Sequence, residues 1–61
     1  MKQIKWPEIG DTYLTDMTGI GFIVTKINKD KMVVYVKLKS GEDKKEYPIK
    51  IDKFYSQLIK E

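Results

Sequence analysis

Glycines set inside a β-prone sequence are the feature that most restricts how this chain can fold. Gly10 begins a turn that we expect to open a strand over residues 12–15. Gly19 and Gly21 predict a tight bend or bulge, because glycine within a strand pattern marks a close approach of the backbone, and a second strand follows over residues 22–27. Short strands that bend at defined places are typical of a small antiparallel barrel, and such barrels usually bind rather than catalyse.

The clearest strand signal lies over residues 32–38. A polar loop at residues 28–31 has a suitable length for a hairpin and connects to it. Its side chains alternate with the period of a strand that buries one face. We expect the buried face to carry Met32, Val34, Val36 and Leu38, and the outward face to carry Val33, Tyr35, Lys37 and Lys39.

The last third of the chain predicts a fourth strand, a helical turn and a final short segment. A charged turn around Gly41 precedes a strand over residues 46–51, in which Pro48 lacks a backbone N–H and so belongs at a sheet edge or an irregular strand end. Asp52 is a good N-cap residue for one α- or 3₁₀-helical turn. Residues 58–60 either extend that helix or form a fifth strand that pairs with the first and closes the barrel. We favour the fifth strand.

Length and composition predict one domain over residues 1–61, with residues 1–9 as a lead-in segment. A chain of this size buries only about 60% of the surface that its unfolded form exposes. It has no Cys and no His, so neither a disulfide nor a zinc site can reinforce it. Eight Ile and seven aromatic residues suit the half-buried surface of a sheet. We therefore predict an all-β, five-stranded antiparallel barrel with one short helical or 3₁₀ turn near the C-terminus.

Several short motifs follow one another in the order seen in a known family. They are Gly10-Asp11-x-Tyr13-Leu14, Gly19-Ile20-Gly21, Tyr35-Val36-x-Leu38, Tyr47-Pro48-Ile49 and Asp52. Over residues 9–60 the chain resembles the RNA-polymerase-interacting domain of CarD-type transcription regulators and of the transcription-repair coupling factor. The resemblance implies an SH3-like (Tudor-like) barrel that binds a protein partner in transcription or DNA repair, with RNA polymerase as the implied partner. A small structural or inhibitory protein of a mobile element is a further interpretation.

The charge pattern permits contact with a polyanion but disfavours sequence readout. The formal net charge is +3, and all 12 cationic residues are Lys. Arg supplies the bidentate fork that recognises guanine, whereas Lys acts as a flexible point charge. The codon preference of an AT-rich genome would explain the same bias.

Four residues are candidates for contact with nucleic acid. Tyr35, Lys37 and Lys39 alternate on the outward face of the third strand, and Lys26 on the second strand joins them. Such a face can neutralise phosphates and stack on a base or sugar, with weak, salt-dependent affinity and little sequence preference. An ordinary solvated sheet face is the alternative interpretation.

The aromatic residues give a second candidate surface. Exposed aromatic side chains form grooves for proline-rich peptides in SH3-like barrels and cages for methylated cations in Tudor-type barrels. In so small a domain, core packing competes with this role. The candidate protein-binding residues are Trp6, Tyr13, Tyr47 and Tyr55. A third route to a partner is strand pairing at a free sheet edge, for which we expect the second or third strand.

Catalysis is not expected from this set of residues. Without His or Cys, the commonest general base and the commonest strong nucleophile are missing. Asp11, Asp16 and Asp52 are read as turn and cap residues, so we predict no catalytic residue, metal, cofactor or small-molecule ligand. No apolar run reaches the length of a membrane span or of a signal-peptide core, which predicts a soluble, cytoplasmic protein without a membrane partner. Nothing in the sequence indicates an oligomeric state.

Overall fold

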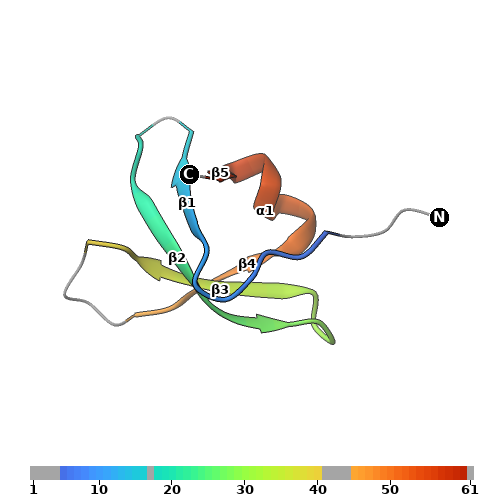
Figure 1. The fold of residues 1–61 in the computed structure, drawn as a ribbon. Coiled ribbons are helices and arrows are strands. Elements are labelled where there is room, and N and C mark those ends of the chain that lie inside the picture. The colour runs from blue at the N-terminus through green and yellow to red at the C-terminus, as the bar shows by residue number, and fades with distance from the viewer. Residues whose placement is uncertain (1–4, 17, 41–44, 61) are drawn as a thin grey trace.

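The computed structural model describes residues 5–16, 18–40 and 45–60. In these residues the chain forms an antiparallel sheet of five strands in the order β4-β3-β2-β1-β5. The sheet curls into a half-barrel, and one short helix lies between β4 and β5 (Figure 1). The elements are β1 (Thr12–Thr15), β2 (Gly21–Asn28), β3 (Val33–Leu38), β4 (Tyr47–Lys50), α1 (Ile51–Gln57) and β5 (Leu58–Lys60).

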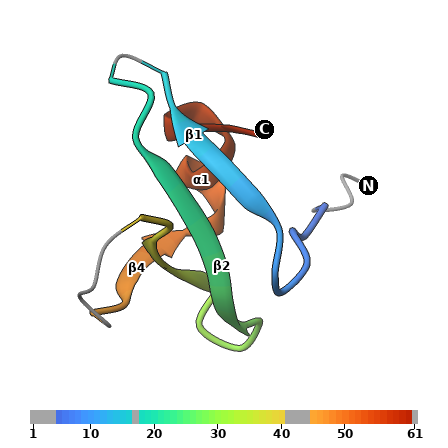
Figure 2. The same cartoon turned by 60° about the vertical axis from the view of Figure 1, so that its left-hand side comes forward.

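The predicted strands and the fifth strand are confirmed. β1 has the predicted bounds, and β5 pairs with it in antiparallel register, with Leu14 opposite Ile59. β4 and β5 each pair with one described strand, so α1 rather than a strand ladder connects these two edges. In the view of Figure 2, β1 and β2 run side by side with α1 behind β1. The curled sheet is therefore open along one side, and the predicted closure of the barrel by the fifth strand is not present in the described residues.

Two glycines shape the turns beside β1. Gly10 has a φ of 97° and Gly19 a φ of 66°, which are left-handed conformations that other residues adopt at a cost. The backbone N–H of Asp11 donates to the carbonyl of Glu8 at 3.0 Å, which closes the turn that leads into β1. The N–H of Gly19 donates to the carbonyl of Thr15 at 3.0 Å, so the bend predicted between β1 and β2 is present.

A β-bulge at Thr25 changes which side chains of β2 face inward. Val24 pairs with Val36 and Lys26 with Tyr35, so Thr25 has no partner of its own in β3. Strict alternation after Val24 would turn Lys26 inward. The bulge instead leaves Lys26 exposed and lets Ile27 pack against the core.

The core lies between the inner face of the sheet and α1. Val34 and Val36 are completely buried, as the alternation of β3 predicts, and Phe54 enters from the helix. The rings of Tyr13 and Phe54 meet edge to face, with centroids 4.8 Å apart. The buried hydrophobic residues are Tyr13, Val24, Val34, Val36, Ile51, Phe54 and Leu58.

Met32 does not belong to that core, so this prediction is wrong. It lies in the turn before β3 with a φ of 59° and has 39% of its surface exposed. Its carbonyl accepts a hydrogen bond of 2.9 Å from the N–H of Ile51. Because this turn redirects the chain, the alternation of β3 begins one residue later than the sequence pattern suggests.

Three further predictions, two on the helix and one on the free edges of the sheet, need correction. α1 begins at Ile51, which was expected to end the fourth strand, so Asp52 lies in the first turn and Lys50 is the N-cap without a side-chain hydrogen bond. The helix has seven residues rather than a single turn. β2 and β3 lie inside the sheet, so the free edges belong to β4 and β5. Pro48 does lie in an edge strand, as expected, and Gly41 lies outside the described residues.

Candidate binding groove

Three of the four predicted protein-binding residues line the same hollow. Trp6, Tyr13 and Tyr55 surround a groove of about 480 Å³ between the N-terminal segment, β1, α1 and β5. These residues are far apart in the sequence and are brought together by the curl of the sheet and by the helix. The groove is completed by Lys5, Pro7, Glu8, Asp11 and Lys60.

The aromatic rings of the groove stand on the core. Tyr13 points inward from β1 and is 3% exposed. Its ring centroid lies 6.4 Å from that of Tyr55, which in turn packs edge to face on Phe54 at 5.2 Å. Tyr55 keeps 46% of its surface exposed, so it forms a wall of the groove while Tyr13 forms the floor.

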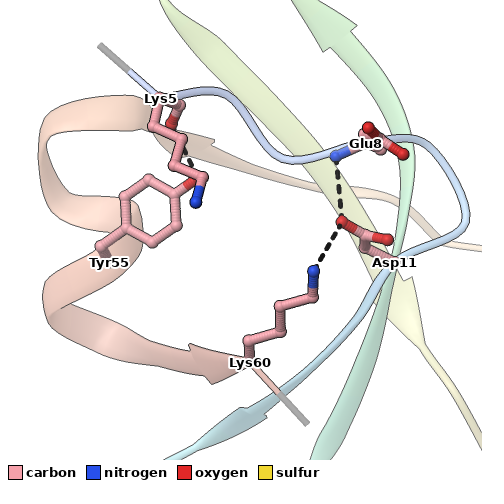
Figure 3. Close-up of polar contacts among 5 residues, drawn as sticks. All are labelled: Lys5, Glu8, Asp11, Tyr55 and Lys60. Carbon is pink, nitrogen blue, oxygen red and sulfur yellow. Dashed lines mark hydrogen bonds and ion pairs between the residues drawn. The ribbon is translucent and has the colours of Figure 1, made fainter. Parts of the chain in front are cut away.

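The opposite wall is the segment that leads into β1. Pro7 is buried, and Trp6 is half-buried and packs against the core. The hydroxyl of Tyr55 donates a hydrogen bond of 2.7 Å to the carbonyl of Lys5, and Figure 3 shows this bond joining the helix to the segment. The segment is therefore attached to α1 beside the groove.

The pKa of Tyr13 is raised from 10.0 to about 12, and burial is the largest cause. Electrostatic interaction with Tyr55, a hydrogen bond to its side chain, and the negative charges of Asp11 and Glu8 contribute the rest of this rise. All of these effects favour the protonated phenol. Tyr13 therefore presents a neutral hydroxyl at the floor of the groove.

Charges of both signs stand at one end of the groove. One carboxylate oxygen of Asp11 accepts the N–H of Glu8 at 3.2 Å and lies 3.8 Å from the ammonium nitrogen of Lys60 (Figure 3). The side chain of Lys60 is 66% exposed, so this ion pair contributes little to stability. An incoming charged group can exchange with either partner at small cost.

Tyr47 lies elsewhere. It lines a separate apolar hollow of about 260 Å³ over β2, β3 and β4, together with Phe22, Val36, Leu38 and Ile49. The rings of Phe22 and Tyr47 meet edge to face at 6.4 Å, and the ammonium of Lys45 lies 5.6 Å from the Tyr47 ring centroid. The structure thus separates Tyr47 from the other three predicted aromatic residues.

Sequence reasoning missed the polar and proline components of the groove. Asp11 was interpreted only as a turn residue, and Lys60 only as part of a final strand. The pairing of β5 with β1 brings Lys60 opposite Tyr13 and beside Asp11. The adjacent Trp6 and Pro7 were the one local signal, because an aromatic residue followed by proline forms a stiff apolar surface.

A further hollow of about 410 Å³ adjoins the groove and shares Lys5 and Tyr55 with it. Met32, Lys50, Ile51 and Asp52 form its remaining lining. Met32, which was predicted in the core but is exposed, therefore lies on this surface. Together the two hollows place apolar surface on both sides of the bond between Tyr55 and Lys5.

The four candidate nucleic-acid residues lie on the outer face of the sheet, away from the groove. Lys26 pairs directly with Tyr35 across β2 and β3, and its ammonium lies 5.8 Å from the centroid of the tyrosine ring. Lys37 and Lys39 follow on the same face, and the stem of Lys39 packs over Gly21, where a Cβ would approach it to 3.4 Å. The predicted grouping of these four residues is present.

Within the described ranges, no three acidic side chains group as they would to hold a metal ion. No helix in the part of the chain that the structure describes is long and apolar enough to cross a membrane. Comparison of the chain with protein-family models, with curated proteins and with solved structures finds no match. The case for a function therefore rests on the residues and their geometry.

Proposed function

We propose that this protein is a non-enzymatic binding module, built as an SH3-like barrel, that takes an extended segment of a protein partner in the groove of Trp6, Tyr13 and Tyr55. The observation that carries the proposal is that these three aromatic residues meet in one open hollow. The order of the strands, with a helix between β4 and β5, supports the SH3-like interpretation of the fold.

The lining of the groove favours a proline-bearing peptide. Aromatic walls accept the flat, stiff surface of an extended proline-rich segment, which loses little conformational entropy when it binds. Tyr13 and Tyr55 offer rings braced by Phe54 rather than mobile side chains. The carboxylates of Glu8 and Asp11 can pair with a Lys or Arg of the partner, and Lys5 and Lys60 can pair with an acidic residue.

RNA polymerase is the first partner to test, because the chain resembles polymerase-interacting domains over most of its length. The edge strand β5 borders the same groove through Lys60, so a partner segment in the groove could also pair with that edge. Groove and edge would then contribute to one interface.

The test is a titration of ¹⁵N-labelled protein with purified bacterial RNA polymerase and with a set of synthetic proline-containing peptides. We expect micromolar binding, with shifts or line broadening centred on Trp6, Tyr13 and Tyr55. Tyr55→Ala should weaken binding at least tenfold, whereas Tyr35→Ala on the outer face should leave it unchanged. Circular dichroism establishes that both variants are folded.

Two results would overturn the proposal. One is the absence of binding by the polymerase and by every peptide at micromolar concentrations. The other is binding that Tyr35→Ala weakens as much as Tyr55→Ala does, which would place the contact outside the groove.

A further inference from the structure

The outer face of β2 and β3 forms a second surface, distinct from the groove. We propose that this face binds the phosphate backbone of duplex nucleic acid weakly and without sequence preference, through Lys26, Lys37 and Lys39. This proposal does not depend on the peptide-binding function, because the groove shares none of these residues.

The bulge at Thr25 is what creates this surface. It turns Lys26 outward, opposite Tyr35. Residues two apart along a strand lie roughly 6.6 Å from one another on the same face. Lys26 is level with Tyr35, so the face extends about 13 Å from there to Lys39. Successive phosphates on one strand of a duplex are spaced about 3.4 Å apart along the helix axis, so this length matches about four phosphates.

Among the described residues, the lysine side chains of this face outnumber the carboxylate attached to it. Glu46 is the carboxylate attached to it, through a hydrogen bond from the hydroxyl of Thr25. Glu8 and Asp11 lie in the groove, and Asp52 lies on α1. Among the described residues, Lys26 and Lys37 outnumber this carboxylate, which gives the electrostatic complementarity that a phosphate backbone requires.

The chemistry of the face favours backbone contact over base contact. The ring of Tyr35 already has an ammonium group 5.8 Å from its centroid and is half-buried, so a base cannot stack freely on it. Lysines contact phosphates as point charges and do not present the planar fork that recognises guanine. A duplex, whose bases are stacked inside, is therefore a better ligand than an unpaired strand.

The experiment measures fluorescence anisotropy of a labelled 16-base-pair duplex between 25 and 200 mM salt. Three phosphate contacts predict that log K falls with log salt with a slope of about −3. Lys26→Gln combined with Lys37→Gln should weaken binding about tenfold or more at low salt and bring the slope to about −1. The matched control is Lys31→Gln combined with Lys53→Gln, which removes the same charge from a turn and from the helix.

Glu46→Gln should increase the affinity for the duplex, which a loss of folding cannot do. Removing this carboxylate should tighten duplex binding severalfold, while Tyr55→Ala in the groove should leave it unchanged. The proposal is overturned if the control pair weakens binding as much as the pair on the face, because net charge alone would then explain it. It is equally overturned if Glu46→Gln has no effect, or if a single strand binds more tightly than the duplex.

Discussion

The hydroxyl of Tyr55 donates a hydrogen bond of 2.7 Å to the backbone carbonyl of Lys5, fifty residues earlier in the chain. The bond attaches the N-terminal segment to α1 beside the aromatic groove (Figure 3). Because Trp6 and Pro7 follow directly, the position of one groove wall depends on this contact.

Tyr55→Phe should therefore loosen the wall without removing the ring. We expect unfolding by urea to become easier by about 0.5–1.5 kcal/mol, the usual value for one hydrogen bond. The fluorescence of Trp6 should also shift toward that of an exposed indole. Tyr35→Phe on the outer face is the control and should leave the tryptophan spectrum unchanged. An unchanged spectrum in both variants would show that the bond does not position the segment.

We predict that the folded protein loses stability at alkaline pH because the pKa of Tyr13 is raised. Its pKa is raised to about 12 in the folded protein, against about 10 in the unfolded chain. Below pH 10 the phenol is neutral in both states and its contribution is fully present. Between pH 10 and 12 the Tyr13 phenol ionises in the unfolded chain but not in the folded protein, so stability falls by up to about 3 kcal/mol.

The measurement is urea unfolding of the wild type and of Tyr13→Phe at several pH values from 8 to 12. The two proteins differ only in the hydroxyl of Tyr13, so the difference between the two curves reports the ionisation of Tyr13. The wild type should lose more stability than the variant above pH 10. Parallel curves would contradict a raised pKa at this position.

Val34→Asp should unfold the domain, because Val34 is completely buried and an aspartate there has no partner. A chain of this size has only roughly 3–5 kcal/mol of stability, which such a burial exceeds. Val33→Asp places the same charge at the neighbouring, half-buried position on the outer face, where it should cost about 1 kcal/mol. Circular dichroism distinguishes the two variants, and equal unfolding would mean that the inward face of β3 is misassigned.

Two substitutions of Thr25, the residue at the bulge, should reduce the stability of the protein by different amounts. Its hydroxyl bonds to Glu46 and lies 3.3 Å from the carbonyl of Tyr35. Thr25→Val keeps the shape but loses both contacts, so we expect about 1 kcal/mol of destabilisation by urea unfolding. Thr25→Ser keeps the hydroxyl and should lose less. The idea fails if serine costs more than valine.

Local sequence signals located the strands well. The bounds of β1 and the inward positions of Val34 and Val36 followed from turn residues and from the period of a strand. Glycine adopts the left-handed conformations of a bend at little cost wherever the rest of the chain lies, so these features can be recognised from neighbouring residues alone.

The positions of Met32 and Asp52 could not be predicted in the same way. The N–H of Ile51 donates to the carbonyl of Met32, and α1 begins at that residue. This hydrogen bond joins residues nineteen positions apart, one directly before β3 and the other at the start of the helix. Local preference gave no sign of it.

The sequence by itself determined the all-β character and the outward positions of Tyr35, Lys37 and Lys39, because each depends on contacts between neighbours or on alternation along one strand. The bulge that turns Lys26 outward arises only from the pairing of β2 with β3. Only the tertiary structure decided that Trp6, Tyr13 and Tyr55 share a groove while Tyr47 does not. That grouping depends on the curl of the sheet, on the pairing of β5 with β1 and on the seating of α1. Each of these joins distant segments whose apolar surfaces are buried only when the whole chain has folded.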